Sequence, residues 1–406
     1  MHVLYFHQHF STPSGAAGTR SYEMAQRLLS RGHEVTMVCG SAQMGKTGLT
    51  GEVQRGLRSG RVDGINVIEI VLPYSNHDSL VKRAFTFLRF AFRSTRIAFG
   101  AKYDLLFATS TPLTASIPGI AMRVLKPGKP FVFEVRDLWP ELPKEMGVIT
   151  NPLILSGMNI LEWLSYRTAH ACVGLSPGIR KGILRRSQKN KQVLLIPNGC
   201  DLRAFQPCVK PGNSSRPLRA VFTGAHGMAN GLDAVLNAAG ELKQRKRQDI
   251  EIHFIGDGKL KEELVARARS EQLDHCHFHD PIPKTELQNR LGEYDVGLMI
   301  LANIPAFYYG TSPNKFFDYI SAGMPILNNY PGWLAELVTE HDCGIPVAPD
   351  DPRAFADALE RLAEDPKSRE KMGQRSRELA ESQFDRIALA DQFVDFLENA
   401  AGVDAS

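Results

Sequence analysis

The chain has 406 residues, which is more than one hydrophobic core usually serves, so its length predicts two domains. With 43% hydrophobic and 23% charged residues, and no apolar stretch long enough to span a bilayer, the composition argues against an integral membrane protein. A net charge of +4 is too small to indicate nucleic acid binding, so we expect no nucleic acid partner.

The first residues and the cysteine pattern indicate the cellular compartment of the protein. Met1 leads directly into the strand-like run HVLYF, without the basic flank and cleavage site of a signal peptide. The six cysteines are scattered and form no C-x-x-C pair, which argues against a disulfide framework and a structural zinc site. We therefore expect a cytoplasmic protein with reduced thiols.

Short β-branched runs alternate with helical segments through the first half. The run VLYF precedes a helix predicted near Thr19–Ser30, a stop at Gly32 and the strand EVTMV. The alternation continues through INVIEIV, DLLFA, PFVFEV, ACVGLS and VLLIP. This pattern predicts a mostly parallel sheet covered by helices.

A linker is predicted between two such halves. The segment 205–217 is rich in proline, glycine and serine and has no periodicity. The alternation then restarts with LRAVFTG, IEIHFIG, CHFH and DVGLMI, with helices predicted at 232–243 and 260–270. We predict domains at 1–205 and 218–384, a linker at 206–217 and a helical tail at 385–406.

Polar motifs follow several strands, where ligands bind in open parallel sheets. Gly15 and Gly18 precede a helix whose amides suit a phosphate, and Arg20 adds a cation; a simple tight turn explains them equally well. The segment EVRDLWPE, residues 134–141, follows the strand PFVF. Its concentration of ionisable groups favours substrate binding over an ordinary surface loop.

Two glycine-bearing strand ends mark the second half. Gly224 and Gly256 each end a strand that leads into a helix, and both loops expose amide groups suited to an anion. Turn chemistry alone does not require this repetition within one sheet. The pattern therefore favours nucleotide binding.

The stretch SPNKFFDYISAGMP, residues 312–325, predicts a helix capped by Ser312 or Asn314 and stopped by Gly323. Lys315 in its first turn opposes the helix dipole, which a bound phosphate would offset. Asp318, one turn later, suits a ribose diol. The alternative is a surface lysine and a solvated aspartate.

A basic and aromatic segment spans residues 81–103. It interleaves six cations with five phenylalanines, a combination that suits the surface of an anionic membrane. A domain helix whose phenylalanines face the core is an equally good interpretation.

Taken in order, Gly15 and Gly18, RGHEVT, EVRDLWPE, IPNGCD, GDG and SPNKFFDYISAGMP resemble family 4 of the retaining GT-B glycosyltransferases. The motifs EVRDLWPE and SPNKFFDY are similar to the branch that contains N-acetylfucosaminyl transferases of bacterial O-antigen and capsule synthesis. The resemblance implies an α/β fold of two Rossmann-like domains facing across a cleft. It also implies an acceptor in the N-terminal half, a nucleotide sugar in the C-terminal half, and a last helix that returns to the N-terminal domain.

The residues and the resemblance together predict the site. The catalytic candidates are Lys315, Arg136 and His9, and the acceptor candidates are Arg20, Glu134 and Asp137. The donor candidates are Gly15, Gly18, Gly224, Asn230, Gly256, Asn314, Lys315 and Asp318. The expected donor is a UDP-sugar and the expected acceptor a lipid-linked saccharide at the inner face of the cytoplasmic membrane. No cofactor and no metal is expected, because the sequence has no Asp-x-Asp pair.

The chain departs from the family pattern at four positions. Ala225 and Asn230 stand where relatives carry an arginine and a lysine for the diphosphate, and Gly310 stands in place of the first of two glutamates. Arg136 replaces a histidine that touches the donor sugar. Two alternatives stay open: a sugar-nucleotide 2-epimerase, which shares the two-domain plan, and a non-catalytic nucleotide-binding module, because glycine loops alone do not specify catalysis.

Overall fold

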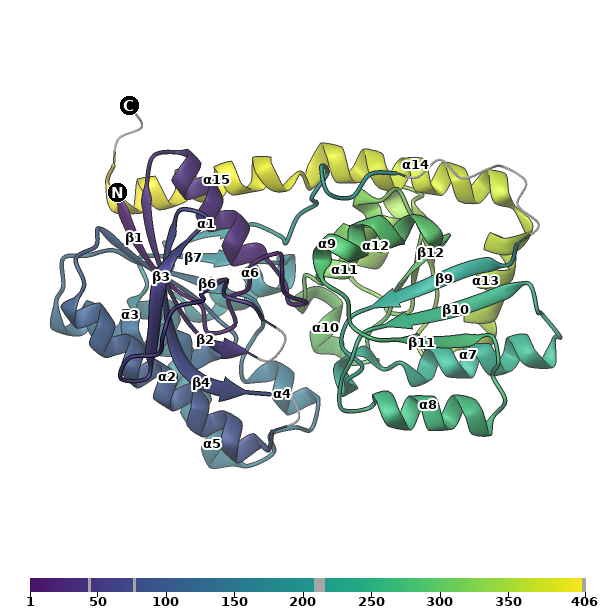
Figure 1. Ribbon diagram of the computed structural model, residues 1–406, viewed down its shortest axis with the longest axis horizontal. Helices are drawn as coiled ribbons and strands as arrows, with labels where there is room; N and C mark the ends of the chain where they lie inside the picture. Colours follow the sequence, from purple (N-terminus) through teal and green to yellow (C-terminus); the bar gives the residue numbers. More distant parts are fainter. Residues whose placement is uncertain (43–44, 76–77, 208–215, 404–406) are drawn as a thin grey trace. The chain divides into compact units, whose positions relative to one another are not determined.

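The computed structural model describes residues 1–42, 45–75, 78–207 and 216–403, and the chain divides into two compact units. The first unit comprises Met1–Pro197, Gly310–Ser312 and Ile387–Ser406, and the second comprises Asn198–Tyr309 and Pro313–Arg386. Each unit carries its own sheet with helices around it (Figure 1). Most of the predicted linker lies outside the described residues.

The first sheet has eight strands in the order β3-β4-β2-β1-β5-β6-β7-β8. All neighbours pair in parallel except β3 and β4, which form an antiparallel hairpin at one edge. The strand order reverses between β1 and β5, which marks a topological switch point. The strands are β1 His2–Phe6, β2 Glu34–Ala42, β3 Leu57–Val62, β4 Ile65–Tyr74, β5 Leu105–Thr109, β6 Phe131–Val135, β7 Ala171–Gly174 and β8 Gln192–Leu195.

Helices cover both faces of this sheet because its strands are apolar on both sides. One face packs on α1 and α15, and the other on α2, α3, α5 and α6. The helices are α1 Arg20–Ser30, α2 Leu80–Gly100, α3 Ile117–Leu125, α4 Glu141–Glu145, α5 Pro152–Thr168, α6 Pro177–Arg186 and α15 Arg386–Ala401, with a 3₁₀ turn at Leu113–Ser116.

The C-terminal helix α15 packs within the first unit. Phe393 meets Phe107 of β5 edge to face, with ring centroids 5.0 Å apart. Asp391 accepts two hydrogen bonds from Arg27 of α1. These contacts bury one side of α15 against the sheet and join the end of the chain to its first half.

The second sheet has six parallel strands in the order β11-β10-β9-β12-β13-β14. The order reverses between β9 and β12, so a second switch point lies there. The strands are β9 Leu218–Thr223, β10 Ile250–Ile255, β11 Cys276–His279, β12 Val296–Met299, β13 Ile326–Asn328 and β14 Gly344–Pro346.

The main core of the second unit lies between this sheet and α7, α8 and α13. Its helices are α7 Asp233–Gln244, α8 Lys261–Ser270, α9 Lys284–Arg290, α10 Pro305–Gly310, α11 Asn314–Ser321, α12 Trp333–Glu340, α13 Pro352–Glu364 and α14 Pro366–Gln383, with 3₁₀ turns at Met228–Asn230 and Leu291–Glu293. The predicted helices at 19–30, 232–243 and 260–270 correspond to α1, α7 and α8.

Three strands were not predicted from the sequence. The strand β3 is polar and largely exposed, so its residues show no hydrophobic alternation, although Asp63 and Gly64 with positive φ form the tight turn to β4. The strands β13 and β14 have three residues each, too few to show a period.

Candidate functional site

In the first unit, the loops after β1, β5 and β6 lie together because these strands are neighbours. A buried ion pair joins them: the Arg20 Nε donates to Glu134 Oε2 over 2.9 Å. The remaining Arg20 nitrogens donate to the carbonyls of Ile196 and Pro197, and Thr109 donates to Glu134 Oε1. Both charged side chains are 1% exposed or less. Hydrogen bonds within the fold use all three Arg20 nitrogens and both Glu134 oxygens, which favours a positioning role over the predicted acceptor contact.

Arg136 is held by two groups of the same loops. Its backbone N–H donates to Ser110 Oγ over 2.8 Å, and its Nη1 lies 3.2 Å from His7 Nε2. A guanidinium only donates, so the His7 Nε2 carries the lone pair. Burial, with Arg136 as the next cause, lowers the pKa of His7 well below its usual value. His7 is thus a neutral support for Arg136 that the site prediction did not include.

His9 lies against two aromatic rings. Its ring centroid is 4.8 Å from that of Tyr74 and 6.2 Å from that of Phe87. Burial, followed by the charges of Arg136 and Arg83, lowers the pKa of His9 to about 4. The imidazole is therefore neutral at pH 7, able to exchange hydrogen bonds with a hydroxyl but weak as a base.

Asp137 follows Arg136 and is half-buried. Thr111 Oγ1 donates to its Oδ2 over 3.1 Å. Burial raises the pKa of Asp137, an effect that Arg136 and Thr111 oppose. The carboxylate is in the same loop cluster as Arg136, as the sequence predicted.

Gly15 and Gly18 lie in the loop between β1 and α1. Gly15 N–H donates to the carbonyl of Thr12, and Thr12 N–H donates to that of Lys46. The helix α1 begins at Arg20, and its N-cap Thr19 provides no side-chain hydrogen bond to the first turn. The anion site predicted at this helix terminus stays a prediction.

In the second unit, the glycine loops after β9 and β10 touch through their backbones. A Cβ on Gly256 would lie 1.9 Å from the carbonyl oxygen of Gly224, and both residues have positive φ. His226 N–H donates to Asp257 O, and Leu260 N–H donates to His226 O. The two loops thus form one unit in which neither glycine tolerates a side chain.

A Gly256→Ala change is expected to destabilise the second unit by about 2–4 kcal/mol and to abolish nucleotide binding, because the methyl group collides with Gly224 and the φ of +151° is strained. Thermal unfolding with and without UDP measures both effects. The matched control is Gly240→Ala in α7, where an added Cβ meets nothing within 4 Å and helix propensity predicts stabilisation by about 0.5–1 kcal/mol. Equal melting temperatures for the two variants would contradict the packing argument.

The side chain of His226 is fully buried under these loops. It packs on the rings of Phe222, Phe254 and Phe278, and neither ring nitrogen has a hydrogen-bond partner among the described residues. Burial, then the charge of Lys261, lowers its pKa to about 4. His226 is therefore neutral and supports the loops from below.

Lys315 supplies the cation of the glycine loops. Its Nζ donates to Asn230 Oδ1 over 2.7 Å and lies 4.2 Å from the ring centroid of Phe222. Asn230 Nδ2 in turn donates to Ala225 O, so the amide joins the lysine to the loop after β9. Within the described ranges no carboxylate forms an ion pair with Lys315, and burial lowers its pKa to about 7. The structure therefore brings Lys315, Asn230 and Gly224 together, as the sequence predicted.

Asp318 lies one turn beyond Lys315 and is almost fully buried. Its Oδ1 accepts a hydrogen bond from Lys284 Nζ over 2.8 Å. Lys284 begins α9 and lies over the ring of Phe205. No local sequence pattern singles out Lys284, because its pairing with Asp318 depends on the folded chain.

The helix α11 differs from the prediction at its N-terminus. It begins at Asn314, and its N-cap is Pro313, which has no side-chain hydrogen bond, so the predicted caps Ser312 and Asn314 are wrong. Its end is as predicted, with Gly323 at φ +66°. Tyr319 accepts a hydrogen bond from Thr223 N–H over 2.8 Å, which anchors α11 to the end of β9. The uncapped first turn therefore presents its amides beside Lys315.

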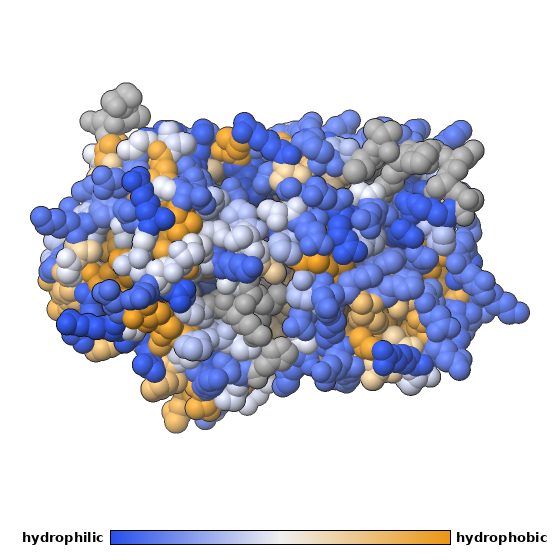
Figure 2. All heavy atoms as spheres, viewed as in Figure 1, coloured by the Kyte–Doolittle hydropathy of each residue, from blue (hydrophilic) through white to orange (hydrophobic). Residues whose placement is uncertain are grey.

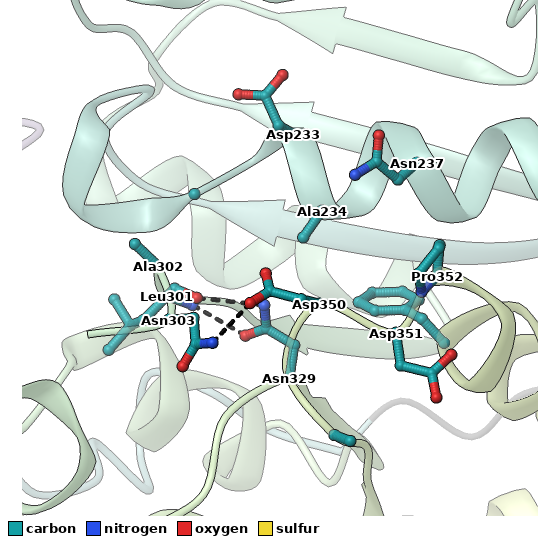
Figure 3. Close-up of a pocket in the computed structure, with 13 residues that line it drawn as sticks. Asp233, Ala234, Asn237, Leu301, Ala302, Asn303, Asn329, Asp350, Asp351 and Pro352 are labelled. Carbon is teal, nitrogen blue, oxygen red and sulfur yellow. Dashed lines mark hydrogen bonds between the residues drawn. The ribbon is translucent and has the colours of Figure 1, made fainter. Parts of the chain in front are cut away.

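A separate cavity of about 250 Å³ lies in the second unit near α7 and α13. Asp233, Asp350 and Asp351 line it, and Asn303 donates to Asp350 (Figure 3). Three carboxylates repel a diphosphate. The glycine loops and Lys315 are therefore the better anion site of this unit.

The sequence matches known families in both halves. Residues 15–199 match the family described as "Glycosyl transferase 4-like domain", and residues 210–379 match "Glycosyl transferases group 1". Both halves of the chain thus match glycosyltransferase models, and the chain is a glycosyltransferase of the GT-B fold. A curated relative, D-inositol 3-phosphate glycosyltransferase of Paenarthrobacter aurescens, is 27% identical over 208 residues. That match covers 46% of this chain and 47%, about half, of the relative.

Solved structures confirm the fold. Sucrose-phosphate synthase from Thermosynechococcus elongatus superimposes with a TM-score of 0.76 at 17% identity, with full coverage of both chains. A glycosyltransferase involved in lipopolysaccharide biosynthesis gives 0.68 at 13% identity, also with full coverage. Anabaena HepE in complex with UDP-glucose gives 0.67 at 15% identity, covering 98% of this glycosyltransferase and 100% of HepE. The predicted two-domain GT-B class is therefore correct.

Proposed function

We propose that this glycosyltransferase moves a sugar from a UDP-sugar to a polyprenyl-diphosphate-linked saccharide in surface polysaccharide synthesis, with retention of anomeric configuration. The donor sugar we propose is an N-acetylated deoxyhexosamine such as N-acetylfucosamine, by the resemblance of EVRDLWPE and SPNKFFDY to that branch. HepE, a structural neighbour, binds UDP-glucose, which supports a UDP-sugar as the donor.

The observation that carries this proposal is the environment of Lys315. An ammonium group with no carboxylate partner in the described part of the chain lies beside two touching glycine loops and an uncapped helix terminus. Burying an unpaired cation is unfavourable, and a bound diphosphate would remove that cost. Asn230 holds the ammonium toward the loop after β9, where the donor diphosphate would bind.

The remaining roles follow from the contacts. The backbone amides and Lys315 stabilise the leaving diphosphate, so no metal is needed for this step. Asp318, with Lys284 on one oxygen, binds the ribose through the other. Arg136, supported by His7, supplies positive charge, while His9 and Asp137 contact the acceptor hydroxyl. The leaving phosphate oxygen accepts the proton of that hydroxyl as the new glycosidic bond forms.

A membrane-facing surface supports the lipid-linked acceptor. On α2, Phe90 faces the core while Val81, Phe85 and Phe92 are exposed, so part of the helix is available to a membrane surface. The helix packs against α3, and α3 against α5, where Leu153 is 82% exposed. Figure 2 shows hydrophobic and hydrophilic residues side by side where Figure 1 draws α2 and α5. No helix in the described ranges has both the length and the apolarity to cross a bilayer.

Arginines accompany the apolar residues of α2. A hollow of about 790 Å³ is lined by Arg55 and by Arg89, Arg93 and Arg96 of α2. The Arg89 and Arg96 guanidinium groups lie over the rings of Phe85 and Phe92. Cations beside exposed aromatic rings are typical of a surface that binds anionic headgroups. We place this surface on the inner face of the cytoplasmic membrane.

Charge reversal on α2 is expected to release the protein from anionic vesicles. Each arginine near an anionic surface contributes about 1 kcal/mol, so Arg89→Glu with Arg96→Glu should weaken binding by at least about 30-fold. Arg93 is left intact because it donates to Gly56 O. Vesicle flotation measures the effect, with Lys367→Glu and Lys371→Glu on exposed α14 as the matched control. Vesicle binding that the α2 variant retains would refute the membrane contact.

A ligand screen tests the donor site. Differential scanning calorimetry with UDP, GDP and NAD should show a rise in melting temperature with UDP alone, because only a ligand of the folded state stabilises it. Mass spectrometry of reactions with UDP-sugars and a synthetic lipid-linked acceptor then identifies the product. An epimerised sugar formed without acceptor would favour the 2-epimerase instead, and binding with no turnover would favour the non-catalytic module.

A further inference from the structure

A cluster of histidines on β10 and β11 has no part in the proposed transfer. The two strands are neighbours at the edge of the second sheet (Figure 1), and their parallel register pairs His253 with His277. Glu251 lies two residues before His253, so both side chains project from the same face. One ligand atom each from Glu251, His253 and His277 lies within 4.8 Å of the other two.

The spacing of these atoms suits a small divalent ion. Ligands at about 2.1 Å from a tetrahedral ion are about 3.4 Å apart, so side-chain rotation that closes the longest gap by about 1.4 Å would complete the shell. The His253 Nε2 is already 3.3 Å from Glu251 Oε2. The His253 and His277 ring centroids are 4.8 Å apart. The backbone pairing of the two strands fixes these positions.

The outer contacts of His253 have the arrangement found around metal-binding histidines. Its Nδ1 lies 3.0 Å from His279 Nε2, so one nitrogen donates and the other accepts. A ring nitrogen that donates to an outer partner fixes the tautomer and leaves Nε2 as the ligand. His279 and Tyr294 pack on the same ring and restrict its orientation.

We propose that Glu251, His253 and His277 bind a divalent transition-metal ion, Zn²⁺ by the chemistry of the ligands, with water in the fourth position. Two imidazoles and one carboxylate are a donor set that zinc takes readily, whereas Mg²⁺ and Ca²⁺ prefer oxygen ligands alone. This ion is distinct from any metal at the donor diphosphate, where none is proposed.

Arg219 is the group that competes with the ion. Its Nε donates to Glu251 Oε2 over 3.0 Å, so a positive charge already neutralises part of the carboxylate. A carboxylate has two oxygens with lone pairs, so Glu251 can accept from Arg219 and still provide a ligand atom for the ion. The guanidinium is partly exposed at 36%, which lets solvent screen its repulsion of the ion.

The site would brace the edge of the second sheet. The strand β11 is an edge strand of four residues, and β10 is its partner in the sheet. An ion bound by side chains of both strands would add a cross-strand contact to the few backbone hydrogen bonds between β10 and β11. It would also steady the segment 280–283, which leads from β11 to Lys284, the partner of Asp318.

Zinc titration tests the proposal. Protein without a polyhistidine tag is stripped with EDTA, dialysed into metal-free buffer and titrated with Zn²⁺ in a calorimeter. We expect one ion per chain and a melting temperature that rises with zinc concentration. Glu251→Gln and His277→Gln should each weaken the affinity at least tenfold. His341→Gln, a half-buried histidine of the same unit, is the matched control and should bind as the parent does.

A second measurement does not depend on variants. Crystals soaked with Zn²⁺ should give an anomalous scattering peak between Glu251, His253 and His277. Absence of saturable binding, equal affinity in His277→Gln, or a peak elsewhere overturns the assignment. None of these readouts uses transferase activity, so the outcome is separate from that of the proposed function.

Discussion

Replacing Lys315 with alanine is expected to lower kcat/KM by about 10²–10³-fold, the range found when one stabilising donor is removed from a developing negative charge. Lys315 is the cation that the structure places at the glycine loops, and Ala225 and Asn230 supply no charge where relatives carry an arginine and a lysine. The assay follows sugar transfer from the UDP-sugar that the ligand screen identifies.

Two variants control this experiment. Lys315→Arg keeps the charge and should retain part of the activity, although the planar guanidinium fits less well between Asn230 and the ring of Phe222. Lys371→Ala removes an exposed lysine of α14 and should have no effect. Full turnover by Lys315→Ala would refute the proposed site, because the proposal assigns the charge of the leaving diphosphate to this ammonium.

The affinity for the UDP-sugar is expected to fall as the pH rises above 7. Burial lowers the pKa of Lys315 from 10.5 to about 7, so the free protein loses the charge above pH 7. A bound diphosphate favours the protonated form, so binding takes up a proton and Kd rises by at most about tenfold per pH unit. Calorimetric titrations from pH 6 to 8.5 measure this slope. Lys315→Arg stays charged, so its Kd should not change over that range.

Lys315 also makes the free energy of unfolding of the ligand-free protein depend on pH. Between pH 7 and 10.5 the unfolded chain holds the Lys315 proton and the folded chain does not. Stability rises with pH wherever the unfolded state binds more protons, so this group makes the ligand-free protein more stable as pH increases through that window. Ligand binding and folding therefore respond to pH in opposite directions.

Features that depend on neighbouring residues in the chain were predictable from the sequence. Gly224 and Gly256 end strands and lead into helices, and Lys315 opposes the dipole of its own helix, so each is anomalous without any knowledge of the fold. The structure brings these groups together and shows that Gly256 contacts Gly224 directly. The strands β1, β9 and β10 were also predictable from local rules, because each is rich in β-branched and aromatic residues.

The sequence failed where a role depends on a distant partner. Lys284 meets Asp318 across 34 residues and His7 meets Arg136 across 129, and neither pair has a local signature. The wrong helix cap at Ser312 has a similar origin, since α11 is anchored by Tyr319 on β9 rather than by a side chain at its own N-terminus. Tertiary contacts replace the local rule in each case.

Arg20 and Glu134 illustrate how such a contact changes a role. Each was predicted to bind acceptor from its place after a strand, yet the two side chains are buried and bonded to each other. Arg20 also donates to the carbonyls of Ile196 and Pro197, which follow β8. It therefore joins the loop before α1, the loop after β6 and the loop after β8. The pair therefore holds the loop that carries Arg136 and Asp137.

Breaking this pair is expected to unfold the first unit more readily. Glu134→Leu leaves the Arg20 guanidinium buried without its carboxylate, and loss of one partner of a buried ion pair costs about 3–5 kcal/mol. Fluorescence of Trp139 and Trp163 in a Trp333→Phe background reports denaturant unfolding of this unit alone. The double variant Arg20→Met with Glu134→Leu removes both charges, so it should recover most of the loss. A double variant as unstable as Glu134→Leu would show that the hydrogen bonds of Arg20 to the backbone carbonyls, rather than the neutralised charge, hold these loops.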